Sequence, residues 1–478
     1  MISISLGIVV MLLSWYAILP RWQLGMVLLL CYLPFAGVVT LSLYPDTLPI
    51  LYKDFFFVIP AYLAYWGASQ DRSVQERVPE LVRIFMWGLA VLVFLQSFNP
   101  GLAAPLVAAI GAKVWLFYLP LLFLAFAMIE SRDGLVRVLR LMVVLAWIPC
   151  CIGIVEWLAS AAFGYEEIMV AIYGEAAEGA TQNFVRFDIG GEFYRIPSTF
   201  TFVTQYFGFT LSMLVPAYAL AKLDDSVSWR RFAMLTLVLA MLASFMSGAR
   251  AAYFFVPLLL LMAYWLDGMF RGVLKVMLMV VPILFVALYV AGIDPFKLYQ
   301  LMKELLLTYS DEIAREGLMD AIENSPFGTG TGMNTGPARY AFDDPEGFIG
   351  IENYYAKAVV ELGIPGLVVV AGLFLILLRQ GYRIQSQLRD EGLRGCASVM
   401  LAFIATTALN SFKGWQIDLD PVNVYFWVFA GMLLKLKYLD QHARTELEAV
   451  PAFGYGHSAA TIRRHGAVKG LLEGGGGK

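Results

Sequence analysis

The chain has 478 residues, of which 60% are hydrophobic and 15% are charged, and its mean hydropathy is +0.70. A soluble protein of this size carries about a quarter charged residues, so the composition excludes a soluble globular protein and indicates a polytopic helical membrane protein. The formal net charge of −3, with an excess of acids in the long loops, gives no reason to expect nucleic acid as a partner.

Apolar stretches of about 20 residues are long enough to cross a membrane as a helix. Taken in chain order, thirteen such stretches are predicted, within a range of 12 to 14: 2–19, 23–43, 54–68, 84–98, 112–130, 137–160, 199–222, 232–247, 250–266, 272–292, 364–379, 396–411 and 421–438. The sequence therefore predicts an all-α fold interrupted by one large and one smaller polar loop.

The basic residues alternate between the connections. Sixteen lie in every second connection, and only Lys53, Lys113, Arg250 and Lys413 are assigned to the short connections between them. Because cytoplasmic loops carry the excess of Lys and Arg, we expect the N-terminus outside, the C-terminus in the cytoplasm and both long loops outside.

This orientation divides the chain into six parts. They are the N-terminal helices (1–163), a smaller outer loop (164–198), the central helices (199–292), the large outer loop (293–363), the C-terminal helices (364–438) and a cytoplasmic tail (439–478).

The distribution of histidine limits the chemistry. All three histidines, His442, His457 and His465, lie in the C-terminal tail. This excludes histidine-based catalysis in the membrane or the outer loops. Because no cysteine has metal-ligand spacing with a histidine, we expect neither a metal nor a cofactor.

The large outer loop contains two recognisable segments. Apolar residues recur at helical spacing over 296–324, which predicts an amphipathic helix that either packs on the membrane helices or covers a cavity. The glycine-rich run that follows, 324–334, predicts a turn. Its backbone N–H groups are also suited to an anion, although no lysine follows the run as in a phosphate loop.

The arginines of the outer face are candidates for phosphate binding. Arg250 lies between two spans, and Arg186 and Arg195 precede the span that begins at 199. Arginine binds phosphate through a planar, bidentate fork, whereas an arginine at this depth can equally extend its side chain to the interface. Arg315, in the large loop, is a fourth candidate for substrate binding.

Three acidic or amide residues complete the set. Glu352 is a candidate general base for an acceptor hydroxyl, and the alternative is an N-cap carboxylate at the start of the next helix. Asn353 is a candidate hydrogen-bond partner for a sugar or for the loop. Glu156, near the outer end of its span, is expected to face a cavity or a partner.

Four stretches carry a resemblance to a known family. They are Ile196-Pro197-Ser198-Thr199-Phe200, Ser247-Gly248-Ala249-Arg250, Asn324-Ser325-Pro326-Phe327-Gly328-Thr329-Gly330, and Glu352-Asn353-Tyr354-Tyr355 through Glu361-Leu362-Gly363-Ile364-Pro365-Gly366-Leu367. With these four stretches in this order, the chain resembles the superfamily of O-antigen ligases and Wzy-type polysaccharide polymerases over about residues 180–380.

The resemblance implies a GT-C type glycosyltransferase in the bacterial inner membrane, acting at its periplasmic face. It implies an undecaprenyl-diphosphate-linked oligosaccharide as donor, a metal-independent reaction with inversion at the anomeric carbon, and essential arginines at Arg250 and at Arg186 or Arg195. The ligases carry a histidine where this chain has Glu352, which favours a polymerase.

Several functions remain open at this point. The first is a polymerase that joins lipid-linked repeat units, with a chain-length regulator or export proteins as partners. The second is a ligase that transfers a finished glycan to a lipid or protein acceptor. A lipid-linked oligosaccharide flippase belongs to another class and would show internal repeats and charges deep in several spans. A non-catalytic scaffold for polysaccharide export is the fourth.

Overall fold

The computed structural model describes residues 2–44, 46, 48–68, 76–174, 187–188, 192–269, 275, 278–279, 281–283, 286, 300, 303, 317–341 and 350–449. The regular secondary structure of this part is helical apart from two short antiparallel strands, β1 (Phe187–Asp188) and β2 (Glu192–Phe193). The predicted all-α class is confirmed. Arg186 and Arg315 lie outside the described residues.

The N-terminal helices are α1 (Ile2–Ile18), α2 (Trp22–Tyr32), η1 (Leu33–Phe35), α3 (Ala36–Ser42), η2 (Leu48–Leu51), the π-helical turn η3 (Asp54–Val58), α4 (Ile59–Ala68), α6 (Glu80–Gln96), α7 (Pro105–Leu116), α8 (Leu121–Met128), α9 (Arg132–Phe163) and α10 (Tyr165–Tyr173). The later helices are α12 (Val203–Leu223), α13 (Val227–Met246), α14 (Ala252–Leu266), α17 (Gly317–Asn324), η5 (Gly336–Ala341), α18 (Tyr354–Gln387), α19 (Glu391–Asn410), η7 (Gln416–Asp418) and α20 (Val422–Ala449).

Within the described ranges, nine helical segments are long and apolar enough to cross a membrane. Each corresponds to one of the thirteen predicted stretches, so the chain is a polytopic membrane protein. Of the other four stretches, 2–19, 84–98 and 250–266 form shorter helices. Most of 272–292 lies outside the described residues.

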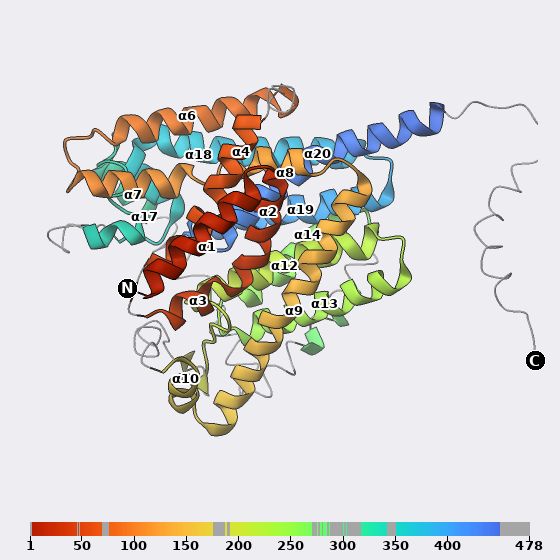
Figure 1. The fold of residues 1–478 in the computed structure, drawn as a ribbon, viewed down its shortest axis with the longest axis horizontal. Coiled ribbons are helices and arrows are strands. Elements are labelled where there is room, and N and C mark those ends of the chain that lie inside the picture. Colours follow the sequence, from red (N-terminus) through yellow and green to blue (C-terminus); the bar gives the residue numbers. More distant parts are fainter. Residues whose placement is uncertain are drawn as a thin grey trace, which may run out of the picture.

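The bundle is built around α12. In that helix 89% of the most apolar window is buried inside the protein, against 39% in α9, which crosses the bundle obliquely (Figure 1). Small and hydroxyl-bearing residues allow α12 to approach its neighbours closely. A Cβ at Gly208 would lie 2.5 Å from Val422 of α20, and Ser244 of α13 donates a 2.8 Å hydrogen bond to Thr210.

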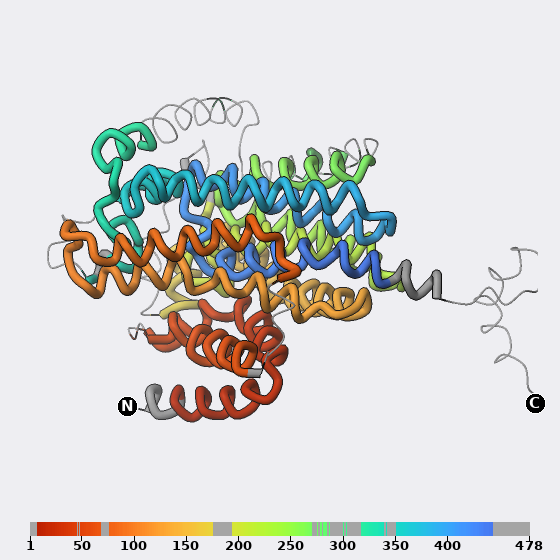
Figure 2. Tube along the Cα trace, turned by 90° about the horizontal axis from the view of Figure 1, so that it is seen from above, coloured from red at the N-terminus to blue at the C-terminus, as the bar shows by residue number. Residues whose placement is uncertain are grey.

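The surrounding helices pack in a consistent order. α12 contacts α9, α13 and α19, while α18 packs against α6 and α20 against α8. Figure 2 shows the N-terminal helices, in red, on one side of the remaining bundle. α17 packs over the first turns of α18, so the described end of the predicted amphipathic segment is a packing helix.

Ion pairs join connections that the charge pattern assigns to the same side. Arg132, at the start of α9, lies 3.0 Å from Asp225, and Arg140 lies 2.7 Å from Asp224, both in the turn after α12. Lys222 lies 2.7 Å from Asp267, which follows α14. Three connections predicted to be cytoplasmic therefore meet at one end of the bundle.

Candidate functional site

The four stretches that carry the family resemblance meet in pairs. In the first pair, the backbone N–H of Ile196 donates a 3.0 Å hydrogen bond to the carbonyl of Ser247. Gly248 has φ +72, and a Cβ there would lie 2.3 Å from the Tyr194 carbonyl oxygen. Only glycine fits this left-handed, crowded position. This contact holds the backbone segment that carries Arg195 against the segment that carries Arg250.

In the second pair, the glycine-rich run lies against a kink in α18. The N–H of Thr329 donates to the carbonyl of Val360 at 2.7 Å, and the N–H of Ile364 donates to the carbonyl of Pro326 at 2.9 Å. Gly363 interrupts α18 with φ +76, and a Cβ at Gly328 would lie 2.8 Å from its nitrogen. The large loop is therefore fixed to the first third of α18, at its kink.

The carboxylate of Glu361 occupies the anion-binding turn of the glycine-rich run. One oxygen accepts from the N–H of Gly332 and from Trp115 Nε1, each at 2.7 Å. The other accepts from the N–H of Asn334 at 3.0 Å and from the Thr335 hydroxyl at 2.9 Å. The backbone N–H groups that were predicted to suit an anion thus bind the Glu361 carboxylate, an anion that the protein itself supplies.

A charged cluster forms where the two pairs of segments come together. The pKa of Lys413, in the turn between α19 and α20, is lowered to about 8, first by burial and also by the cations Arg250 and Arg195. The Glu352 carboxylate acts on the same amine in the opposite direction. Because such interactions weaken beyond about 10 Å, Arg195, Arg250 and Glu352 each lie near the Lys413 amine. We call these three residues and Lys413 the outer charge cluster.

The backbone shows how this cluster is assembled. The N–H of Tyr354, two residues after Glu352, donates a 2.9 Å hydrogen bond to the carbonyl of Ser411, two residues before Lys413. Arg195, Arg250 and Lys413 are half-buried, and Glu352 is exposed. The structure thus brings together three sequence-predicted residues and adds Lys413, which the sequence reasoning counted only as a topological marker.

Asn353 is fully buried and caps α18. Its side-chain oxygen accepts from the N–H of Tyr355 at 2.9 Å and of Ala356 at 3.1 Å. The alternative assignment of Glu352 as the N-cap is therefore wrong, because the adjacent amide takes that position. The carboxylate is left at the surface of the cluster.

The turn that carries Lys413 is held by two ion pairs whose lysines are both buried. Lys357, which is fully buried in α18, pairs with Asp418, and its ammonium lies 4.7 Å from the centre of the Trp115 ring. Lys53 lies 2.9 Å from Asp420. Charges in membrane helices are costly without such partners, so both pairs restrain the turn between α19 and α20.

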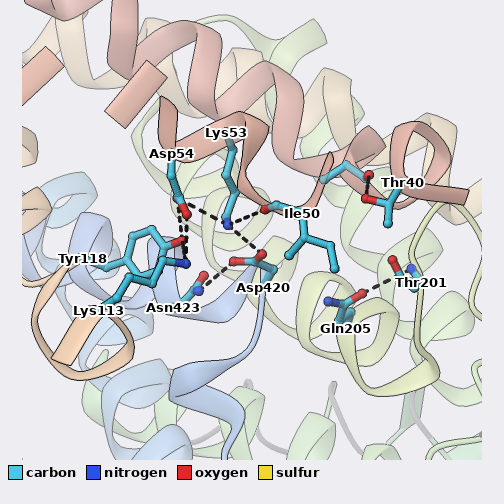
Figure 3. A network of polar contacts seen from close by, with 11 residues as sticks. Thr40, Ile50, Lys53, Asp54, Lys113, Tyr118, Thr201, Gln205, Asp420 and Asn423 are labelled. Atoms are coloured by element: carbon cyan, nitrogen blue, oxygen red, sulfur yellow. Dashed lines mark hydrogen bonds and ion pairs between the residues drawn. The ribbon is translucent and has the colours of Figure 1, made fainter. Parts of the chain in front are cut away.

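Figure 3 shows that the second of these pairs belongs to a larger network. The Asp54 carboxylate lies 3.4 Å from Lys53 and 2.8 Å from Lys113, and accepts from the Tyr118 hydroxyl at 2.7 Å. The assignment of both lysines to short connections is therefore wrong. Lys53 lies inside the helical segment Leu48–Gly67 and Lys113 inside α7, where ion pairing removes the need for exposure to water.

Glu156 faces both hydrogen-bonding partners within the protein and a cavity, as predicted. Its carboxyl group is 3.1 Å from the Tyr173 hydroxyl and accepts from the N–H of Ser198 at 2.9 Å. It lines a hollow with Thr199 and with Val38 of α3. Ser198 has φ +53, the one positive φ outside glycine within the described chain, and such strain is common near functional positions.

No group of three or more His, Cys, Asp or Glu side chains suited to a metal ion occurs within the described ranges. The four positions of the outer charge cluster instead offer three cations and one carboxylate.

Comparison of the chain with models of known protein families and with curated proteins finds no match in either set. The resemblance carried by the four motifs therefore remains a hypothesis about function.

Proposed function

We propose that the protein is a glycosyltransferase that polymerises oligosaccharide repeat units carried on undecaprenyl diphosphate, at the periplasmic face of the bacterial inner membrane. The observation that carries the proposal is the outer charge cluster. It unites Arg250, Arg195 and Glu352, which were singled out from the sequence for this chemistry, and it adds Lys413.

The cations suit the donor. A diphosphate bears several negative charges, and arginine forks with an ammonium group bind such an anion well. The same groups would stabilise the charge that develops on the phosphate oxygen as the sugar leaves. Arg250 and Arg195 are carried by backbone segments in direct contact, which supports a shared ligand.

The carboxylate suits the acceptor. Glu352 is exposed and lies near Lys413. In the proposed step it takes the proton of the acceptor hydroxyl while that oxygen bonds to the anomeric carbon. The bond from the anomeric carbon to the phosphate oxygen breaks, and the lipid diphosphate leaves with the electron pair. Attack from the opposite face inverts the anomeric carbon, as the family resemblance implies.

The test uses a deletion strain complemented with variants at matched expression. Arg250→Ala and Glu352→Gln should each leave single repeat units on the lipid carrier and no polymer. Arg230→Ala, an exposed arginine in α13, is the matched control and should give normal polymer. Full-length polymer retained on lipid would identify a ligase, and normal polymer from both variants would reject the assigned site.

A transporter is the second candidate, favoured by one observation. Lys53, Lys113 and Glu361 lie inside three different spans, and charges in spans are typical of transport pathways. None is more than eight residues from the start of its helical segment, so each lies within about 12 Å of the same end. A flippase defect would leave repeat units on the cytoplasmic face, and a polymerase defect on the periplasmic face.

A further inference from the structure

An open groove of about 560 Å³ lies between α4, α6 and the junction of α7 with α8. The helix formed by α7 and α8 is interrupted between Leu116 and Leu121, and Pro120 lines the groove at this break. α6 is a peripheral helix, with Trp87 72% exposed and Ile84 52% exposed. The groove therefore opens towards the surrounding lipid.

The depth of the groove matches one membrane leaflet. On α6 its lining extends from Glu80 to Ala90, and ten residues of α-helix rise about 15 Å. This is half of the roughly 30 Å hydrocarbon core of a bilayer. Below the charged mouth the lining is mainly apolar, with Leu116, Leu119 and Phe123 on the opposite wall.

The mouth of the groove carries one charge of each sign. Glu80 and Arg83 are three residues apart on α6 and therefore share a face. Neither forms an ion pair with another residue of the described chain. Arg83 Nε is buried and has no hydrogen-bond acceptor among those residues. A buried donor without an acceptor is costly, so the groove is suited to a ligand that supplies one.

We propose that this groove binds one membrane phospholipid whose headgroup carries both a phosphate and a primary ammonium. An acyl chain fills the apolar part, the phosphate accepts from Arg83, and the ammonium pairs with Glu80. Trp66, near the end of α4, also lines the groove, and tryptophan favours the level of the headgroups. A purely anionic headgroup would satisfy Arg83 but would leave Glu80 without a cation.

The groove is separate from the outer charge cluster. Glu80 begins α6, whereas the far end of the same helix reaches the large loop, where Gln96 donates a 2.6 Å hydrogen bond to the carbonyl of Phe327. The charge pattern assigns the Glu80 end to the cytoplasmic side. Lipid binding here is thus independent of the proposed glycosyl transfer.

The test is native mass spectrometry of the purified full chain in detergent, with equal amounts of phosphatidylethanolamine and phosphatidylglycerol added. The wild type should retain phosphatidylethanolamine in preference. Arg83→Gln should lower the retention of both lipids about tenfold, the effect of losing a charge-assisted hydrogen bond. Glu80→Gln should abolish the preference while leaving phosphatidylglycerol bound.

Matched controls remove exposed charges outside the groove, namely Arg137→Gln and Glu76→Gln, and both should behave as the wild type. Ala90→Trp fills the groove without changing charge and should lower retention of both lipids, with size-exclusion chromatography confirming an intact fold. If Arg83→Gln retained as much of both lipids as Arg137→Gln, the proposed binding site would be rejected. A preference that survives Glu80→Gln would overturn the headgroup assignment.

Discussion

Replacing Glu361 with Gln tests whether its carboxylate holds the large loop on α18. The carboxylate accepts four hydrogen bonds, from Gly332, Asn334, Thr335 and Trp115. A glutamine retains one acceptor oxygen. Its amide is best placed towards Asn334 and Thr335, because the Thr335 hydroxyl can rotate to accept whereas Gly332 N–H and Trp115 Nε1 can only donate.

In that arrangement the Asn334 N–H loses its acceptor inside the protein, and the remaining bonds lose their charged partner. A hydrogen bond to a charged group contributes about 1.5–3 kcal/mol, so we expect a loss of roughly 2–4 kcal/mol. The expected result is a lower melting temperature, together with faster proteolysis of the loop because local opening becomes easier.

The assay is thermal unfolding of the purified protein in detergent, followed by tryptophan fluorescence, with limited proteolysis in parallel. Glu323→Gln, which alters an exposed carboxylate of α17, is the matched control and should behave as the wild type. If Glu361→Gln proved as stable and as resistant to proteolysis as Glu323→Gln, the carboxylate would not be what holds the loop.

Three further changes test the surroundings of the cluster. Lys357→Met leaves the Asp418 carboxylate buried without its cation and should lower the free energy of unfolding by about 3–5 kcal/mol. Thermal unfolding should show this loss, and the double variant Lys357→Met with Asp418→Asn should partly restore the stability. Gly248→Ala introduces a Cβ against the Tyr194 carbonyl at a left-handed position, and should reduce polymer formation without abolishing expression; normal polymer would contradict the requirement for close contact. Because Lys413 is cationic below its pKa of about 8 and neutral above it, donor binding should weaken as the pH rises through 8, and Lys413→Arg should remove this dependence.

The membrane helices were predictable because the signal is local. A run of apolar residues long enough to cross a bilayer is visible in the sequence, and nine of the predicted stretches are found as such helices in the described chain. Helix ends were less predictable. α9 extends to 32 residues and α18 to 34, since polar residues at their ends pair with other parts of the protein instead of ending the helix.

The buried charges illustrate what the sequence could not show. Lys53 was assigned to a connection because a lysine beside an apolar run is usually exposed, but its partner Asp420 lies 367 residues further along the chain. Only the folded structure brings such partners together. The role of Glu361 had a visible signal, since a carboxylate inside the long apolar stretch of α18 needs donors, yet the identity of those donors was not evident.

The arginines of the cluster had a stronger signal. Arg250 and Arg195 were selected because cations are sparse on the predicted outer face, and the structure places both, like Glu352, near Lys413. Lys413 was missed as a site residue because nothing in its local sequence distinguishes it from an interfacial lysine. Its place in the cluster depends on the turn that Asp418 and Asp420 restrain.

The most direct test of the central proposal is reconstitution with a single substrate. Purified protein in lipid vesicles is supplied with an undecaprenyl-diphosphate-linked repeat unit, and the products are sized. The account predicts a ladder of lengthened lipid-linked glycans from the wild type and from Arg230→Ala, and unextended substrate from Arg250→Ala. A ladder from Arg250→Ala equal to that of the wild type would contradict the account.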